Sequence, residues 1–341
     1  MKRFFARIQL KLLFILLTFC LLLLSACNQQ IRQQAIDGSL STAPAVTRIV
    51  KHALGQTQVP LHPQRIVTLD PFSAEYVLAL GVEPVGAPGR TLLELQLPWD
   101  AKEKIADISW RPTNLEKVAA LKPDLIFGNL ADHQDIYQLL SHIAPTIMLK
   151  SSYLNWKQAF ALVAQTLGKT DTFEQIIAAY DTRLADFKAK MGNRLDKTQV
   201  SVVRVTLQRN DVFIKGSFSG TILKDAGLTR PNAQNFDAAG GRRKGGNEVA
   251  YSFSPELLSI ADGDALFVIP EASTGNIDAE KALQQLQTQP LWSKLKVVKQ
   301  GKAYVVGRYW VCCGAIAANR VIDDLFKYLI PLSIDEKLPS S

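Results

Sequence analysis

The chain has 341 residues, of which 47% are hydrophobic and 21% are charged, and its formal net charge is +8. This length accommodates two domain-sized cores or one large α/β unit. Four of the basic residues lie before residue 12, so the remaining excess of positive charge is small and gives no indication of a nucleic-acid partner.

The amino-terminal segment has the pattern of an export signal. Basic residues are followed by an apolar run, residues 12–24, which is shorter than the roughly 20 residues of a spanning helix. The run ends at Leu24-Ser25-Ala26-Cys27, which resembles a bacterial lipobox. We therefore expect a signal peptide over residues 1–26, a lipid on Cys27 and a flexible tether within residues 27–59, with an uncleaved amino-terminal anchor as the alternative.

The mature chain would retain two adjacent cysteines besides the lipidated one, Cys312 and Cys313. Their spacing does not suit a zinc site. Two small buried thiols are the favoured interpretation, and a vicinal disulfide is the alternative.

Residues 60–155 alternate between short β-branched runs and apolar-rich helical segments. This order is typical of parallel strands with crossover helices. The expected strands are residues 65–69, 82–86, 125–128 and 146–148, and the expected helices are residues 74–80, 115–121 and 133–143.

A long amphipathic helical stretch follows over residues 156–195, with a break at Gly168, and a second α/β alternation covers residues 196–333 before a tail, residues 334–341. The predicted fold is therefore α/β: two Rossmann-like lobes with mostly parallel sheets, joined by a single long helix, with a cleft between the lobes. Ligands of open α/β sheets bind outside the carboxyl ends of the strands, so the loops there are expected to line this cleft.

Signatures of an enzyme are scarce. The segment Gly240–Gly246 lacks the spacing of a phosphate-binding loop, and Gly216–Gly220 has Phe218 where a nucleophile elbow needs serine. The four histidines do not pair at the spacing of metal ligands, and His133 is expected on the surface. We expect neither a catalytic nor a metal site, and no cofactor.

Arginines beside aromatic residues recur in the loops expected at the cleft. Guanidinium groups bind oxygen anions and stack on planar groups, and aromatic side chains bury large apolar faces. Together they suit a bulky, anionic, partly apolar ligand, whereas the alternative is that each arginine forms a surface ion pair and each tryptophan lies in a core. The candidate ligand-binding residues are Arg90, Trp110, Arg111, Arg242, Arg243, Tyr251, Arg308, Tyr309 and Trp310.

Three segments together resemble the periplasmic-binding-protein-like receptors for ferric siderophores and cobalamin that serve ABC importers. They are Asn114-Leu115-Glu116 followed by residues 121–126, then residues 252–264, and finally residues 314–325, which are similar to the closing helix of the siderophore branch. The resemblance extends from about residue 60 to 332.

The resemblance implies a monomeric receptor that carries a ferric siderophore to an ABC permease dimer, with Glu116 and Glu256 docking on the two permease subunits. The alternative for Glu116 is that it only stabilises its helix N-terminus. Hydroxamate or citrate-hydroxamate chelators are favoured, and the chelator would saturate the iron. The receptor would face the periplasm or the cell exterior. A cobalamin or haem receptor and an extracytoplasmic hydrolase are the competing hypotheses.

Overall fold

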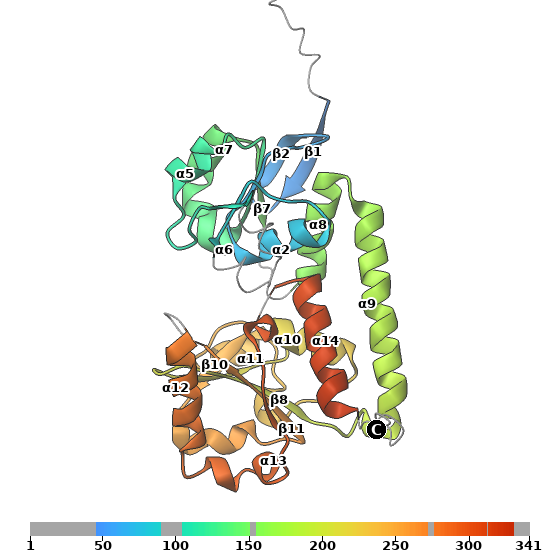
Figure 1. Cartoon of the computed structure of the whole chain (residues 1–341), viewed down its shortest axis with the longest axis vertical. Helices are drawn as coiled ribbons and strands as arrows, with labels where there is room; N and C mark the ends of the chain where they lie inside the picture. Colours follow the sequence, from blue (N-terminus) through green and yellow to red (C-terminus); the bar gives the residue numbers. More distant parts are fainter. Residues whose placement is uncertain (1–45, 90–103, 151–154, 272–275, 312, 331–341) are drawn as a thin grey trace, which may run out of the picture. The chain divides into compact units, whose positions relative to one another are not determined.

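The computed structural model describes residues 46–89, 104–150, 155–271, 276–311 and 313–330. The chain divides into two compact units, Met1–Val46 and Thr47–Ser341. All helices and strands below belong to the second unit (Figure 1). Cys27 and the predicted signal peptide lie outside the described residues.

An antiparallel hairpin opens the second unit. Strands β1 (Thr47–His52) and β2 (Gly55–Pro60) pair from Thr47 opposite Pro60 to His52 opposite Gly55. The Arg48 guanidinium anchors the hairpin by donating to the carbonyls of Leu61 at 2.6 Å and Gln165 at 2.9 Å. The tether expected over residues 27–59 therefore does not extend beyond Val46, because residues 47–60 pair as a ribbon that buries Val50 and Val59.

The first five-stranded sheet is entirely parallel, with the order β5-β4-β3-β6-β7. Its alternation of strands and helices confirms the prediction, although the expected strand over residues 82–86 is reduced to β4 and the expected helix over residues 133–143 is interrupted. The strands are β3 (Ile66–Thr68), β4 (Gly86–Ala87), β5 (Ala106–Asp107), β6 (Leu125–Asn129) and β7 (Thr146–Leu149), and the helices are α2 (Pro71–Ala79), α5 (Leu115–Ala120), α6 (Leu130–His133), η1 (Gln134–Ile136) and α7 (Tyr137–Ile143).

The connection predicted as a single long helix with a break at Gly168 consists of two helices. Helix α8 (Trp156–Leu167) ends at this glycine, whose φ of 67° lies in the left-handed region that favours glycine. Helix α9 (Thr170–Met191) then runs alongside α14 (Ala315–Leu329), as Figure 1 shows, and the Arg183 guanidinium bonds Asn319 and Asp323 across this contact.

The second five-stranded sheet has the order β10-β9-β8-β11-β12. Strands β8, β11 and β12 are parallel, whereas β9 is antiparallel to both β8 and β10. The strands are β8 (Val200–Val205), β9 (Asn210–Phe213), β10 (Ala250–Phe253), β11 (Ala265–Pro270) and β12 (Ala303–Val305), and the preceding and following helices are η2 (Gly192–Arg194), α10 (Phe218–Asp225), η3 (Asn232–Gln234), α11 (Ala238–Arg243), η4 (Pro255–Ala261), α12 (Asn276–Gln287), η5 (Trp292–Lys294), α13 (Lys296–Lys299) and η6 (Arg308–Trp310).

One apolar core extends from the hairpin and α2 through α8 and α9 to β11 and α14. Phe160 of α8 is fully buried in it, with its ring 5.5 Å from that of Tyr76 and 5.1 Å from that of Phe173. We expect Phe160→Ala to lower the free energy of unfolding by about 3 to 5 kcal/mol, because it leaves a cavity among rigid rings. Chemical denaturation measures this loss, and an effect below about 1 kcal/mol would contradict a continuous core here.

Candidate functional site

The carboxyl ends of the parallel strands in the first sheet share one edge, and the predicted Trp110–Arg111 pair lies just beyond the end of β5. Trp110 Nε1 donates to Asp132 Oδ2 at 3.2 Å, and Arg111 Nη2 lies 2.6 Å from Asp132 Oδ1. The Arg111 guanidinium also covers the Trp110 ring, 4.2 Å from its centroid. Asp132, in α6 beyond the end of β6, organises this pair and was not predicted.

The charge of Asp132 is stabilised locally. Burial opposes its ionisation, but hydrogen bonds from Asn129, Arg111 and Trp110 hold the pKa of Asp132 below its ordinary value. Arg111 nevertheless keeps 59% of its side-chain surface exposed, so it can still meet an anion. The neighbouring His133 is buried, which corrects the expected surface position: its Nδ1 lies 3.1 Å from the carbonyl oxygen of Asn129.

A second group of charged residues lies at one edge of the second sheet, where the parallel strands β8, β11 and β12 end and the antiparallel strand β9 begins. We call Arg204, Arg209 and Arg308, with Asp211 and Glu271, the arginine cluster. Arg204 Nη2 lies 2.6 Å from Asp211 Oδ2 and Arg204 Nη1 lies 3.2 Å from Glu271 Oε2. Arg308 Nη1 lies 3.1 Å from Glu271 Oε1, and Arg209 Nε lies 3.0 Å from Asp211 Oδ2.

This cluster has three guanidinium groups and two carboxylates, so it carries an excess of positive charge. Arg204 and Arg308 expose only 18% and 22% of their side chains, and Asp211 only 3%. Ionic groups this buried keep a fixed geometry, which suits recognition of an oxygen anion. Of these five residues, only Arg308 is predicted from the sequence. Asp211 lies opposite Arg204 because β9 pairs antiparallel with β8, and no local motif encodes that pairing.

Two predicted aromatic residues next to Arg308 are held by one carboxylate. Asp324 Oδ2 accepts a hydrogen bond from the Tyr309 hydroxyl at 2.7 Å and from Trp310 Nε1 at 2.8 Å. The Trp310 ring has no exposed surface and stacks on Phe267 with centroids 4.2 Å apart. Trp310 is therefore a core residue, which contradicts its expected place on a cleft wall; Tyr309 is half-buried, with Arg320 over its ring.

The structure does not join the remaining predicted ligand residues to the arginine cluster. Arg242 and Arg243 form the last turn of α11 rather than part of a glycine-rich loop, and Arg242 Nη1 pairs with Glu248 Oε1 at 2.9 Å. Arg243 lines a separate pocket of about 530 Å³ with Lys215 and Phe236. Tyr251 is buried in β10 and donates to the Ala233 carbonyl at 2.6 Å. Arg90 lies outside the described residues.

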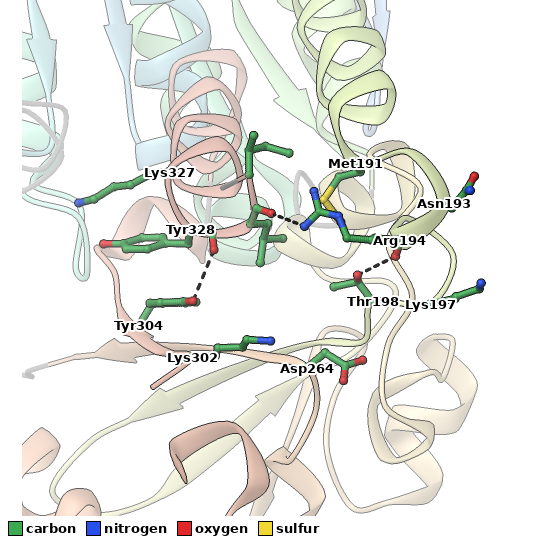
Figure 2. A pocket seen from close by; sticks show the side chains of 12 residues that line it. Met191, Asn193, Arg194, Lys197, Thr198, Asp264, Lys302, Tyr304, Lys327 and Tyr328 are labelled. Carbon is green, nitrogen blue, oxygen red and sulfur yellow. Dashed lines mark hydrogen bonds between the residues drawn. The ribbon is translucent and has the colours of Figure 1, made fainter. Parts of the chain in front are cut away.

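A basic pocket of about 750 Å³ lies at the opposite edge of the second sheet, around the C-terminal ends of α9 and α14 (Figure 2). Its cations neighbour helix carbonyls: Arg194 Nη1 donates to the Leu329 carbonyl at 3.1 Å. The Tyr304 and Tyr328 rings stack 4.2 Å apart in its wall. Basic groups at helix C-termini stabilise the helices, so these contacts have a structural explanation.

The described residues hold neither a candidate metal centre nor a membrane-crossing helix. Among them, no group of three or more His, Cys, Asp or Glu side chains is placed to bind a metal ion. In the same part of the chain, no helix combines the length and apolarity that crossing a bilayer requires.

Comparison with protein families identifies the kind of molecule. Residues 66–309 match the model of a family described as periplasmic binding protein. The chain belongs to the periplasmic binding protein family. A relative from Bacillus subtilis named probable siderophore-binding lipoprotein YfiY is 34% identical over 332 residues, which cover 94% of this chain and 98% of the relative.

A further relative and a solved structure are similar to this chain over most of its length. The B. subtilis Fe(3+)-citrate-binding protein YfmC is 30% identical over 302 residues, covering 86% of this chain and 88% of its own. The structure of Staphylococcus aureus SirA complexed with staphyloferrin B superposes with a TM-score of 0.70 at 25% identity, covering 83% of this chain and 98% of that one. These relatives are binding proteins, and the predicted two-lobe fold is confirmed.

The two carboxylates that the resemblance predicts to dock on a permease, Glu116 and Glu256, are exposed on short helices. Glu116 lies in the first turn of α5, which Asn114 caps through its side-chain oxygen, 2.9 Å from the Lys117 amide. Glu256 lies in the first turn of η4, where a hydrogen bond with Ser254 lowers its pKa. Cys313 is disulfide-bonded, contrary to the favoured pair of thiols.

Proposed function

We propose that this chain is a lipid-anchored, extracytoplasmic receptor that binds a ferric siderophore and delivers it to an ABC permease. The arginine cluster is the observation that carries the proposal, because it presents an excess of fixed positive charge at a carboxyl strand edge. Its relatives are named for binding siderophores and ferric citrate. The receptor acts as a monomer, and Cys27 carries the lipid.

The ligand is a chelate whose own oxygens saturate the iron, so that the protein recognises the organic anion. Bidentate guanidinium groups match carboxylates, which favours citrate-hydroxamate chelators over neutral ones. Trp110 and Arg111 contribute a flat, cationic surface from the first sheet. Arg90, Arg242, Arg243 and Tyr309 stay in the proposal as further candidate contacts.

Replacement of Arg308 tests the site. Glu271 keeps Arg204 as an ionic partner when Arg308 is removed, so Arg308→Ala retains a paired carboxylate and a folded chain. We expect Arg308→Ala to weaken binding by about tenfold or more, since a charge-assisted contact to the ligand is lost. Quenching of tryptophan fluorescence by ferrichrome, ferric aerobactin and ferric citrate measures it, with Trp110 as the reporter.

Arg183→Ala is the matched control, because Arg183 pairs with Asp323 on the surface of α9 and α14. The control should bind as the unaltered protein does. Arg242→Ala, measured beside it, decides whether α11 contributes to the same site. Binding of cobalamin or haem with no response to any ferric chelate would keep the fold and reject the iron assignment.

A further inference from the structure

A buried carboxylate on α2 caps the helix that closes the second sheet. Glu75 has no exposed surface. Its Oε2 accepts the Gly314 amide at 2.8 Å, and its Oε1 accepts the amides of Ile316 at 2.7 Å and Ala317 at 3.1 Å. These amides belong to the N-cap and the first turn of α14, where amides lack partners inside the helix. Glu75 therefore supplies, from 239 residues away in the sequence, the cap that a local side chain normally provides.

The start of α14 has no cap of its own. Gly314 occupies the N-cap position and has no side chain, and a Cβ atom there would lie only 2.7 Å from Cε1 of Tyr76. The next residue of α2 strengthens the contact, because the Tyr76 hydroxyl donates to the Cys313 carbonyl at 3.2 Å. Glu75 and Tyr76, which are adjacent in α2, therefore hydrogen-bond to Gly314 and Cys313, which directly precede α14.

The capped helix comes shortly after the turn that carries Arg308. Helix α2 begins at the carboxyl end of β3, where the Asp70 side chain accepts the amides of Phe72 and Ser73. The turn η6 follows β12, starts with Arg308 and leads within a few residues to Gly314. Glu75 therefore connects the carboxyl edge of the first sheet to the turn that presents an arginine of the proposed site.

We propose that Glu75 is a positioning residue: by capping α14 it fixes the Arg308 turn relative to the first sheet and so sets the affinity of the arginine cluster for its anionic ligand. This inference rests on the proposed function for the ligand, but the capping itself does not depend on it. No side chain of the ligand site need touch Glu75 for the effect to occur.

Protonation gives the link a dependence on pH. Burial raises the pKa of Glu75 to about 7, although the three amides and the positive charge of Arg320 favour the ionised form. A proton on one oxygen removes an acceptor from the α14 amides, so the cap weakens as the pH falls below about 7.

The other charges on the packed elements are already engaged. Lys157, the charged residue of α8, pairs with Asp225 at 2.9 Å. On α14, Asp323 pairs with Arg183 and Asp324 accepts from Tyr309 and Trp310, while Lys327 lies over the Tyr328 ring. Asp70, at the start of α2, is buried and its pKa is raised by desolvation.

Hydrogen exchange of the ligand-free protein tests the cap directly. Glu75→Gln keeps the shape of the side chain but removes its charge. The amide oxygen of the glutamine can still accept from Ile316 and Ala317 at the Oε1 position, whereas its NH2 group cannot accept from Gly314. At about pH 8 we therefore expect the Gly314 amide to exchange roughly tenfold or more faster in this variant. Glu83→Gln, at an exposed position just after α2, should exchange as the unaltered protein does. Unchanged protection in Glu75→Gln would overturn the cap.

Ligand affinity tests the positioning role. In titrations with ferric aerobactin between about pH 6 and pH 8, the unaltered protein and Glu83→Gln should lose affinity toward the acid side, whereas Glu75→Gln should be weaker and nearly independent of pH. Equal affinity and equal pH profiles would reject positioning even if exchange changes.

Two further outcomes separate the hypotheses. If Glu75→Gln does not fold, hydrogen exchange of the unaltered protein still tests the cap. The protection factor of the Gly314 amide, corrected for the pH dependence of intrinsic exchange, should fall relative to those of the rest of α14 as the pH drops below about 7, and an unchanged ratio would overturn the cap. If the unaltered protein binds no ferric chelate, the proposed function fails, while the exchange experiment still judges the cap.

Discussion

A protein carrying Glu116→Ala and Glu256→Ala together is expected to bind its ferric chelate normally and to lose nearly all transport. Both side chains are exposed, on α5 and η4, and neither belongs to the arginine cluster. Carboxylates that meet cations on a partner contribute to orientation and to the association rate, and loss of both removes that complementarity. Uptake of radioactive iron by cells measures transport, and fluorescence titration measures binding.

A matched variant separates docking from a general loss of surface charge. Glu83→Ala with Glu280→Ala also removes two exposed carboxylates, and it should transport iron at the unaltered rate. Normal uptake by the Glu116 and Glu256 double variant would make the docking assignment wrong. The alternative role of Glu116 is to stabilise the N-terminus of its helix, and circular dichroism of the same variant shows whether helix content is lost.

Replacement of Asp324 by alanine is expected to destabilise the protein strongly, because one oxygen of this carboxylate accepts from two donors. The change leaves the Tyr309 hydroxyl and the Trp310 indole amine without their acceptor, and Trp310 is fully buried. We expect a loss of about 2 to 4 kcal/mol in the free energy of unfolding, since the unsatisfied buried Trp310 donor costs about 1 to 3 kcal/mol and the half-buried Tyr309 hydroxyl costs less. Denaturant titration measures the loss.

Asp324→Asn is the control for this variant. Its amide oxygen can occupy the position of Oδ2 and accept both bonds, so the loss should be much smaller, about 1 kcal/mol. The two variants should also differ in ligand affinity, because the turn that contains Trp310 starts with Arg308. Equal stability of the alanine and asparagine variants would show that the two hydrogen bonds contribute little.

Local sequence patterns predict most helices and strands where the apolar periodicity agrees with the capping and turn residues at the ends of the segment. Residues 314–325, which resemble the closing helix of the siderophore branch, lead into and form most of α14 (Ala315–Leu329), since the apolar stripe of this helix and the glycine before it are both local signals. The antiparallel strand order of β9 and β10 and the amino-terminal hairpin were not foreseen. These depend on which strands meet, and strand pairing is a non-local choice that short runs do not encode.

The candidate site was only partly predictable for the same reason. The pairing of arginine with aromatic residues in loops predicts Trp110, Arg111 and Arg308 as site residues. All three lie in charged groups at the edges where the parallel strands have their carboxyl ends. Trp310 and Tyr251 share that composition but are core residues. A sequence cannot tell an aromatic ring that faces a ligand from one that packs on a neighbouring strand, because both positions favour the same residue.

The sequence by itself determined the α/β alternation, the helical connection with its break at Gly168 and the membership of the binding-protein family. Each of these follows from patterns that recur within a few residues or from motifs that keep their spacing. Only the tertiary structure decided that Arg204, Asp211, Glu271 and Arg308 form one cluster and that Glu75 caps a helix 239 residues away. Such pairs arise because buried charges and orphaned amides must find partners wherever the fold brings them.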